Sequence, residues 1–252
     1  TFPVDLDNLT ILLMEEQDTN KLDLQRKIQN ILDELTNQNI IREEDGQYHF
    51  FKEDEIDVSA EIQNTVITQE GRLTALHDDI FSKMIQIQKK YGYGNNNFNL
   101  AISFDDKDIF SQGDINVTFN FYDPEDINQK ALGLSRNDLM FCLNDLQKDD
   151  MLKSDFNRYV QTKKYIRQHY DNATGTRRQT LDNFSTRNKN KLTEIQKKFE
   201  NLFKTAQIIS GQQVLKPGEL KNSAPGARYQ EALNLHFESI YKKHDQVKGY
   251  AS

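Results

Sequence analysis

The run Leu-Met-Phe-Cys-Leu at residues 139–143 restricts the fold of this chain more than any other stretch. All five side chains are apolar, and turn-forming residues flank the run, SRND before it and ND after it. A strand that is apolar on both faces is typical of the middle of a sheet, where other elements cover it. The run therefore predicts a buried central strand, with helices on at least one side of the sheet.

Three further segments supply neighbours for this strand. They are MIQIQKKYGY at 84–93, FNLAISF at 98–104 and INVTFNFY at 115–122, and each alternates apolar and polar side chains with the period of a strand. The stretches YGYGNNN and SQGD between them are rich in turn-forming residues. Together with a helical stretch before them, these segments predict an α/β region with a small mixed sheet at residues 53–147.

The first 52 residues predict a separate module. An apolar helical stretch, LTILLMEEQ, is followed by an amphipathic helix and then by two hydrophobic segments around Asp45-Gly46, a strong hairpin signal. Two helices and a two-stranded wing indicate a winged helix at residues 1–52. However, this module has 11 acidic and 5 basic residues, and its wing tip is Glu43-Glu44-Asp45. Because these charges repel phosphate, we expect protein contacts or internal packing rather than DNA readout.

Residues 148–252 predict a basic helical region. Leu152, Phe156, Tyr159, Ile166 and Tyr170 follow helical spacing, and a second pattern continues through residues 176–206. A helix of that length favours coiled-coil-like or antiparallel packing. A short hairpin near 207–215 and a last helix follow, with His236 and His244 predicted at its packing face. The whole chain is thus predicted to be α+β, with a winged helix, a small mixed sheet and a long-helix region.

The charge is distributed unevenly along the chain. Residues 1–150 have 30 acidic and 13 basic side chains, a net of −17, while residues 151–252 have 9 and 19, a net of +10. This asymmetry favours either an internal docking surface or a surface for nucleic acid or an acidic partner. The candidate contact residues are Lys163, Lys164, Arg167, Arg177, Arg178, Arg187, Lys189, Lys191, Lys197 and Lys198. The alternative is a solvated helix face that balances the acidic half.

The stretch YVQTKKYIRQHY at 159–170 has the composition of a nucleic-acid-binding strip, with three tyrosines among basic residues. Helical spacing places Tyr159, Ile166 and Tyr170 on the apolar face and leaves only Tyr165 off it. We therefore predict a helix that docks inside the protein, and a narrower phosphate or carboxylate contact on the face with Lys163, Lys164 and Arg167.

No pattern in the sequence indicates catalysis or a cofactor. The apolar strand before Asp145 resembles a Walker B element, but no Gly-Lys dipeptide supplies the phosphate loop. Gly92-Tyr93-Gly94 is too short for a dinucleotide site, and we expect the Asp78-Asp79 pair to lie on a solvated helix face rather than to hold a metal. We expect a non-enzyme with no cofactor and no metal.

The cysteine count and the hydropathy of the chain limit the cellular settings in which it is expected. Cys142 is the one cysteine, so no intramolecular disulfide forms and a reducing cytoplasmic setting is expected. The five histidines have no compact ligand spacing. No apolar run approaches the roughly 20 residues that span a bilayer, so no membrane partner is expected. The chain opens on Thr1, which suggests a piece of a longer polypeptide.

The order of these features resembles the region beyond the ATPase domain in the large P-loop proteins of bacteriophage-exclusion (BREX) systems, the BrxC/PglY type. Two motifs carry the resemblance. One is FKEDEIDVSAEIQNT, with Glu61-Ile62-x-Asn64-Thr65 at its end; the other is Tyr159 with Thr162, Lys164, Tyr165, Ile166 and Arg167. The resemblance implies a fragment of a multidomain bacterial ATPase used in defence against phage. The family's nucleotide-binding residues belong to a part that is absent here.

Two functions follow from these observations. The first is a non-catalytic accessory or scaffold segment of a phage-defence ATPase. Its partners would be other domains of the parent ATPase, other proteins of the defence system, or DNA. The alternative is a winged-helix DNA-binding transcriptional regulator, which the acidic wing disfavours.

Overall fold

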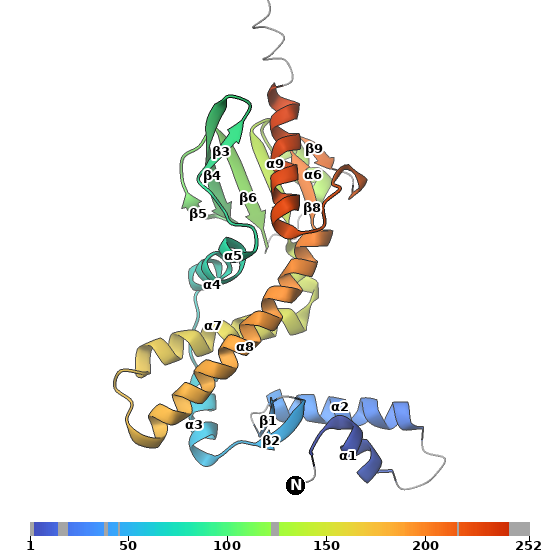
Figure 1. The fold of residues 1–252 in the computed structure, drawn as a ribbon, viewed down its shortest axis with the longest axis vertical. Coiled ribbons are helices and arrows are strands. Elements are labelled where there is room, and N and C mark those ends of the chain that lie inside the picture. The colour runs from blue at the N-terminus through green and yellow to red at the C-terminus, as the bar shows by residue number, and fades with distance from the viewer. Residues whose placement is uncertain are drawn as a thin grey trace, which may run out of the picture. The chain divides into compact units, whose positions relative to one another are not determined.

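A computed structural model describes residues 3–14, 20–37, 40–44, 46–121, 126–215 and 217–241 (Figure 1). The chain forms two compact units. Unit 1 consists of residues 1–66 and 161–186, and unit 2 of residues 67–160 and 187–252. Two helices, α7 (Asp150–His169) and α8 (Gly175–Thr205), therefore contribute to both units. This division differs from the three segments that the sequence suggests, because each unit combines stretches that are distant along the chain.

Unit 1 begins with two helices and a hairpin. They are α1 (Leu6–Leu12), α2 (Lys21–Asn37), β1 (Ile41–Glu44) and β2 (Gln47–Phe50). The side chain of Asp5 caps α1 by accepting a hydrogen bond from the Asn8 amide at 2.7 Å. Ile28, Leu32 and Ile41 form a small core. The predicted order of helix, helix and hairpin is present; the winged-helix classification stays a prediction, and Asp45 lies outside the described residues.

The rest of unit 1 is helical. Helix α3 (Glu53–Gln63) packs with the last part of α7 and the first part of α8 around Val58, Ile62, Tyr165, Leu181 and Phe184. The ring of Phe51, which precedes α3, stacks on that of Phe184 with centroids 6.2 Å apart. Segments about 100 residues apart in the sequence thus share one core.

Unit 2 is built on a seven-stranded mixed sheet. Its strands are β3 (Lys90–Tyr93), β4 (Asn96–Phe104), β5 (Lys107–Phe110), β6 (Ile115–Asn120), β7 (Asp138–Cys142), β8 (Gln207–Ser210) and β9 (Gln213–Leu215). Six strands follow the path β3-β4-β6-β7-β8-β9, and β5 pairs beside this path with β4. The strands β4, β6 and β7 are parallel, and the other pairs are antiparallel. The predicted central strand is confirmed, because β7 lies between β6 and β8.

Two details of the sheet differ from the sequence prediction. Only Lys90–Tyr93 of the segment 84–93 is a strand, because Met84 ends a helix and the chain turns at Gln86, whose φ is +49°. The hairpin near 207–215 is present, but its first strand hydrogen-bonds to β7. The hairpin therefore extends the sheet and is not part of a separate helical region.

Helices cover both faces of this sheet. They are α4 (Gln69–Ala75), a π-helical segment (Leu76–Phe81), α5 (Ser82–Met84), α6 (Ile127–Gly133) and α9 (Pro225–Tyr241), with short 3₁₀ turns at Asn144–Lys148 and Pro217–Glu219. Figure 1 shows α9 beside β8. On the opposite face, Ala131 of α6 packs on Cys142 and Ile209. The rest of that second face carries polar side chains of β4, β6 and β7, with Ala101 and Met140 among them.

The main core of unit 2 is aromatic. Phe81, in the π-helical segment, has its ring centroid 5.4 to 6.1 Å from those of five other phenylalanines. They are Phe104 and Phe119 on the sheet, Phe121 just after it, and Phe199 and Phe203 on α8. Aromatic pairs in these geometries gain energy beyond the burial of their surface. The high phenylalanine content of the chain is thus concentrated under the sheet.

The predicted turn SQGD brings two backbones close together. A Cβ atom on Gly113 would lie 2.1 Å from the backbone nitrogen of Ala101 and 2.6 Å from the carbonyl carbon of Leu100. Only glycine fits at such a separation. Gly113 therefore lets the segment before β6 pass directly beside β4.

Candidate partner-contact surface on the basic helices

The ten predicted contact residues are divided between the two units. Unit 1 contains Lys163, Lys164, Arg167, Arg177 and Arg178, and unit 2 contains Arg187, Lys189, Lys191, Lys197 and Lys198. Helices α7 and α8 pack antiparallel within each unit; in unit 2, for example, Phe156 lies against Phe199. The sequence predicts coiled-coil-like or antiparallel packing for the long helix, and this contact corresponds to the antiparallel alternative.

In unit 1, Arg177 belongs to a cluster with Glu61 and Tyr165, which we call the Glu61 cluster. The Arg177 guanidinium nitrogen lies 2.6 Å from Glu61 Oε2 and 2.6 Å from the Tyr165 hydroxyl oxygen, and that hydroxyl donates to Glu61. The hydrogen bond from Tyr165, aided by Arg177, lowers the pKa of Glu61. Burial, together with the bond to Glu61, raises the pKa of Tyr165 to about 12. Three helices meet at this cluster, because Glu61 comes from α3, Tyr165 from α7 and Arg177 from α8.

Two more side chains of α7 bind the end of α3. Gln161 Nε2 donates to the carbonyl oxygens of Gln63 and Thr65, at 2.9 and 3.1 Å. Lys164 Nζ donates to the carbonyl oxygen of Val66 at 2.8 Å. Val66 lies three residues beyond the end of α3, so Lys164 attaches the segment just after this helix to α7.

Arg178 closes the connection between α7 and α8. Its guanidinium donates to the carbonyl oxygen of Tyr170 at 2.9 Å and lies over the Tyr170 ring, 3.6 Å from the centroid. The Tyr170 hydroxyl in turn donates to Asp182 at 2.7 Å. Lys164, Arg177 and Arg178 therefore make contacts within unit 1. Lys163 and Arg167 are exposed.

The tyrosines of YVQTKKYIRQHY are arranged differently from the prediction. Tyr159 is buried, as predicted, but so is Tyr165, with 3% of its surface exposed, whereas Tyr170 is only half-buried. The predicted assignment of Tyr165 outside the packing face is wrong. The reason is that α7 does not bury one continuous stripe. Its first part packs in the core of unit 2 and its last part on α3 in unit 1, and different sides are covered.

In unit 2, two candidate cations form ion pairs. Lys198 lies 3.2 Å from Asp155 on α7, and Lys191 lies 2.9 Å from Glu194, one turn along α8. Arg187 is half-buried. The exposed candidates are Lys189 and Lys197, eight residues apart on α8.

Helical geometry puts Lys189 and Lys197 on one side of α8, about 12 Å apart along the axis. Lys204 falls on the same side and is also exposed, within 3.4 Å of Asn201. The sequence prediction missed this lysine, although the helical period alone would have found it. We call Lys189, Lys197 and Lys204 the α8 lysine row. The half-buried Glu200 lies among them, so the row has a net charge of +2.

The Asp78-Asp79 pair is placed differently from the prediction. Asp79 is largely buried, with 9% of its surface exposed, and hydrogen-bonds to the Tyr159 side chain. The predicted solvated face is wrong for Asp79, because α4 and the π-helical segment pack into the core of unit 2. Asp78 remains exposed and pairs with His77 at 2.6 Å.

The other predicted chemistry sites have simple structural roles. Asp145, which follows β7, forms an ion pair with Lys148 at 2.6 Å. His236 is buried in the packing face of α9, as predicted, while His244 lies outside the described residues. Across the described ranges, no three histidine, cysteine or acidic side chains come together in a way that could hold a metal ion. None of the helices in those ranges is long and apolar enough to cross a bilayer.

Comparison with known proteins identifies a family. No solved structure matches the chain. The model of a protein family matches residues 65–235, more than two thirds of the chain, and its description is "BREX ATP-binding protein BrxC 4th domain with six-stranded beta sheet". The six strands on the continuous path of the sheet agree with this description. The chain therefore belongs to the BrxC family of BREX ATP-binding proteins, and the match covers a domain beyond the ATPase.

Proposed function

We propose that this chain is a non-catalytic accessory or scaffold segment of a BREX phage-defence protein. The observation that carries the proposal is the family match, which corresponds to a domain outside the ATPase core. In this proposal the segment positions the ATPase of its parent protein relative to other proteins of the system. It does so in the reducing cytoplasm, a setting that suits its single cysteine, Cys142.

The α8 lysine row is the proposed contact. Lys189, Lys197 and Lys204 are exposed on one side of the helix, whereas Lys191 and Lys198 already pair with acidic side chains. A row with a net charge of +2 attracts an acidic surface over a short range. Proteins that bind DNA through its backbone commonly make about six to ten phosphate contacts. Three lysines and a glutamate supply fewer, which favours an acidic protein surface over DNA.

The test is a charge reversal with a matched control. The triple variant K189E, K197E, K204E changes the charge of the row by six units. The variant K83E, K89E, K90E makes the same change at three other exposed lysines of unit 2. We expect the first variant to weaken binding to a purified protein of the same BREX system at least ten-fold, and the second to leave it within two-fold. Isothermal titration calorimetry with each purified component measures both.

The same proteins are titrated with duplex and single-stranded DNA at two salt concentrations. If DNA binds, the binding weakens steeply with salt, and it is lost on charge reversal of the row, the partner of the row is DNA and not an acidic protein surface. If the native chain binds none of the purified components and no DNA, the proposed contact function is wrong.

The winged-helix regulator has less support. Arg42 is the one basic residue of the hairpin strands, excluding histidine, and such a cation would be needed to contact phosphate. Its guanidinium instead lies 3.1 Å from the buried Glu55 and 3.2 Å from Glu44. The hairpin cation is therefore used to attach the hairpin to α3 within unit 1.

A further inference from the structure

The second face of the sheet in unit 2 has an ordered polar surface. Alternate residues of β4, β6 and β7 point away from the aromatic core, and the strand register aligns them in two rows. Ala101, Asn116 and Asp138 form one row, and Ser103, Thr118 and Met140 form the next. Helix α6 covers the neighbouring part of this face, around Cys142 and Ile209, and Met140 at the end of the second row packs against that cluster.

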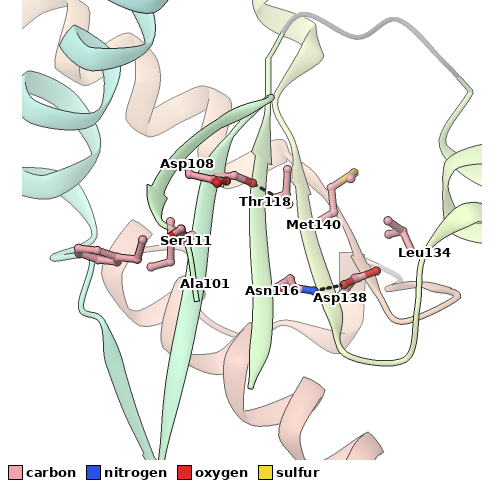
Figure 2. A pocket seen from close by; sticks show the side chains of 11 residues that line it. Ala101, Asp108, Ser111, Asn116, Thr118, Leu134, Asp138 and Met140 are labelled. Atoms are coloured by element: carbon pink, nitrogen blue, oxygen red, sulfur yellow. Dashed lines mark hydrogen bonds between the residues drawn. The ribbon is translucent and has the colours of Figure 1, made fainter. Parts of the chain in front are cut away.

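A hollow of about 300 Å³ lies over the two rows (Figure 2). Asp108 and Phe110 of β5, with Ser111, form one wall, and Leu134, just after α6, lies on the other side. Figure 2 shows Asp108 near Thr118, and Leu134 beyond Met140. The hollow is half-open, so a group can enter it from the surface of unit 2 without any movement of the chain.

Hydrogen bonds within the floor fix its side chains. Asn116 Nδ2 donates to Asp138 Oδ1 at 2.8 Å, and the backbone amide of Ser135 donates to the other Asp138 oxygen at 2.7 Å. The hydroxyls of Ser103 and Thr118 lie 3.0 Å apart. One of the two Asn116 N–H donors is therefore used, and its amide oxygen remains as an acceptor. These hydrogen bonds hold the side chains of the floor in place without a ligand.

The remaining polar groups are mostly acceptors. The carboxylate of Asp108 makes no hydrogen bond or ion pair with any residue that the structure describes. Among the described residues that line the hollow there is no lysine, arginine or histidine, and there are two carboxylates. A phosphate or another anion would be repelled there. A cation with several N–H donors is the complementary ligand.

Three apolar side chains also line the hollow, so its ligand should have an apolar part as well as a positive charge. Phe110, Met140 and Leu134 provide surface for an aliphatic or planar group. An arginine side chain has both parts: an apolar stem and a planar guanidinium with five donors, which stacks on aromatic rings. We propose that this hollow is a binding site for an arginine side chain presented by a partner protein. This inference is independent of the proposed contact through the α8 lysine row.

The probe is an arginine residue blocked at both ends, Nα-acetyl-arginine methylamide, titrated into the ¹⁵N-labelled chain. The corresponding citrulline derivative has nearly the same shape without the charge. We expect the arginine probe to shift the NMR signals of Ser103, Asn116 and Thr118 in a saturable way. The citrulline probe should cause less than one fifth of that shift at the same concentration.

The variant pair D108N and D106N tests the carboxylate. Both residues are exposed and lie two positions apart in the sequence, but only Asp108 lines the hollow. D108N should raise the Kd for the arginine probe at least five-fold, and D106N should leave it within two-fold. An unchanged spectrum of the free D108N protein shows that its fold is kept. Equal binding of arginine and citrulline, saturable shifts located elsewhere, or an unchanged Kd in D108N would each overturn the proposal.

Discussion

His236 shows at the scale of one residue how burial sets a charge. Its ring is fully buried in the packing face of α9, and Nδ1 lies 2.8 Å from the Ser210 hydroxyl oxygen. Burial lowers its pKa to about 4, although the carbonyl of Asn137 and the charge of Asp138 favour the protonated form. The folded protein therefore holds this histidine neutral at pH values where an unfolded chain would protonate it.

The pH dependence of stability follows from that difference. Between the unfolded pKa of about 6.5 and the folded value of about 4, the unfolded state binds more protons, so stability falls as the pH falls. From pH 6.5 to pH 5, we expect His236 to lower the free energy of unfolding by about 1.5 kcal/mol. Urea unfolding at several pH values measures it.

The variant H236Q should lose this part of the pH dependence, because glutamine does not titrate. The variant H49Q, at an exposed histidine of unit 1, should keep it. If H236Q and the native protein show the same slope between pH 6.5 and pH 5, burial of His236 does not control acid stability.

Two buried tyrosines allow a comparison of hydroxyl groups. The hydroxyl of Tyr229 has no hydrogen-bond partner among the described residues, and burial raises its pKa. Tyr159, in contrast, hydrogen-bonds to the largely buried Asp79. Removing a hydroxyl without a partner costs little, but removing the Tyr159 hydroxyl takes a hydrogen bond away from a buried carboxylate.

We therefore expect Y229F to be neutral or to stabilise unit 2 by up to about 1 kcal/mol, and Y159F to destabilise it by about 1 to 3 kcal/mol. Each variant removes one oxygen and keeps the ring, so packing is matched. Urea unfolding followed by circular dichroism measures both. Equal losses in the two variants would show that the Asp79 contact adds nothing to stability.

At the scale of elements, the Glu61 cluster explains how unit 1 is joined. It links α3 with the end of α7 and the start of α8. Both motifs that carry the resemblance to the BREX family contribute to it: Glu61 comes from the first motif and Tyr165 from the second. These motif residues therefore have a structural role. Glu61 and Arg177 are each more than 40% exposed, so their ion pair is partly screened by water.

A double-mutant cycle with E61Q and R177M measures this link. We expect a coupling free energy of about 0.5 to 1 kcal/mol for the ion pair, and a loss of about 1 to 2 kcal/mol for Y165F, whose buried hydroxyl donates to Glu61. R167A, at an exposed arginine of the same helix α7, serves as the control and should change stability by less than about 0.5 kcal/mol. A coupling of zero would mean that the cluster does not hold the three helices together.

Local patterns predicted most elements but not their partners. The apolar run at 139–143 identified β7, because both faces of this strand carry apolar side chains and all of the run but Met140 is buried, and helical spacing identified α8 almost to its ends. The contact between Glu61 and Arg177 joins residues 116 positions apart, and spacing along the chain has no information on it. The hollow on the sheet was missed for the same reason, since its rows exist only in the register of three strands.

At the scale of the whole molecule, part of the charge asymmetry is neutralised within unit 1. The acidic helix α3 has Glu53, Asp54, Glu55, Asp57 and Glu61, and it packs with the basic segment 161–186. The sequence allowed either an internal docking surface or an external partner. In unit 1 two basic side chains make such internal contacts. Arg177 binds Glu61 on α3, and Lys164 binds the backbone carbonyl of Val66 just after this helix.

The composition of unit 1 from two distant stretches has a practical consequence for protein production. The family match begins at residue 65, and a gene fragment cut there would encode α7 and α8 without α3. The side chains of Tyr165, Leu181 and Phe184 would lose the surface of Val58 and Ile62 that covers them. A hydrophobic patch of this kind favours aggregation during expression. The boundary of sequence similarity is therefore a poor place to begin a recombinant protein.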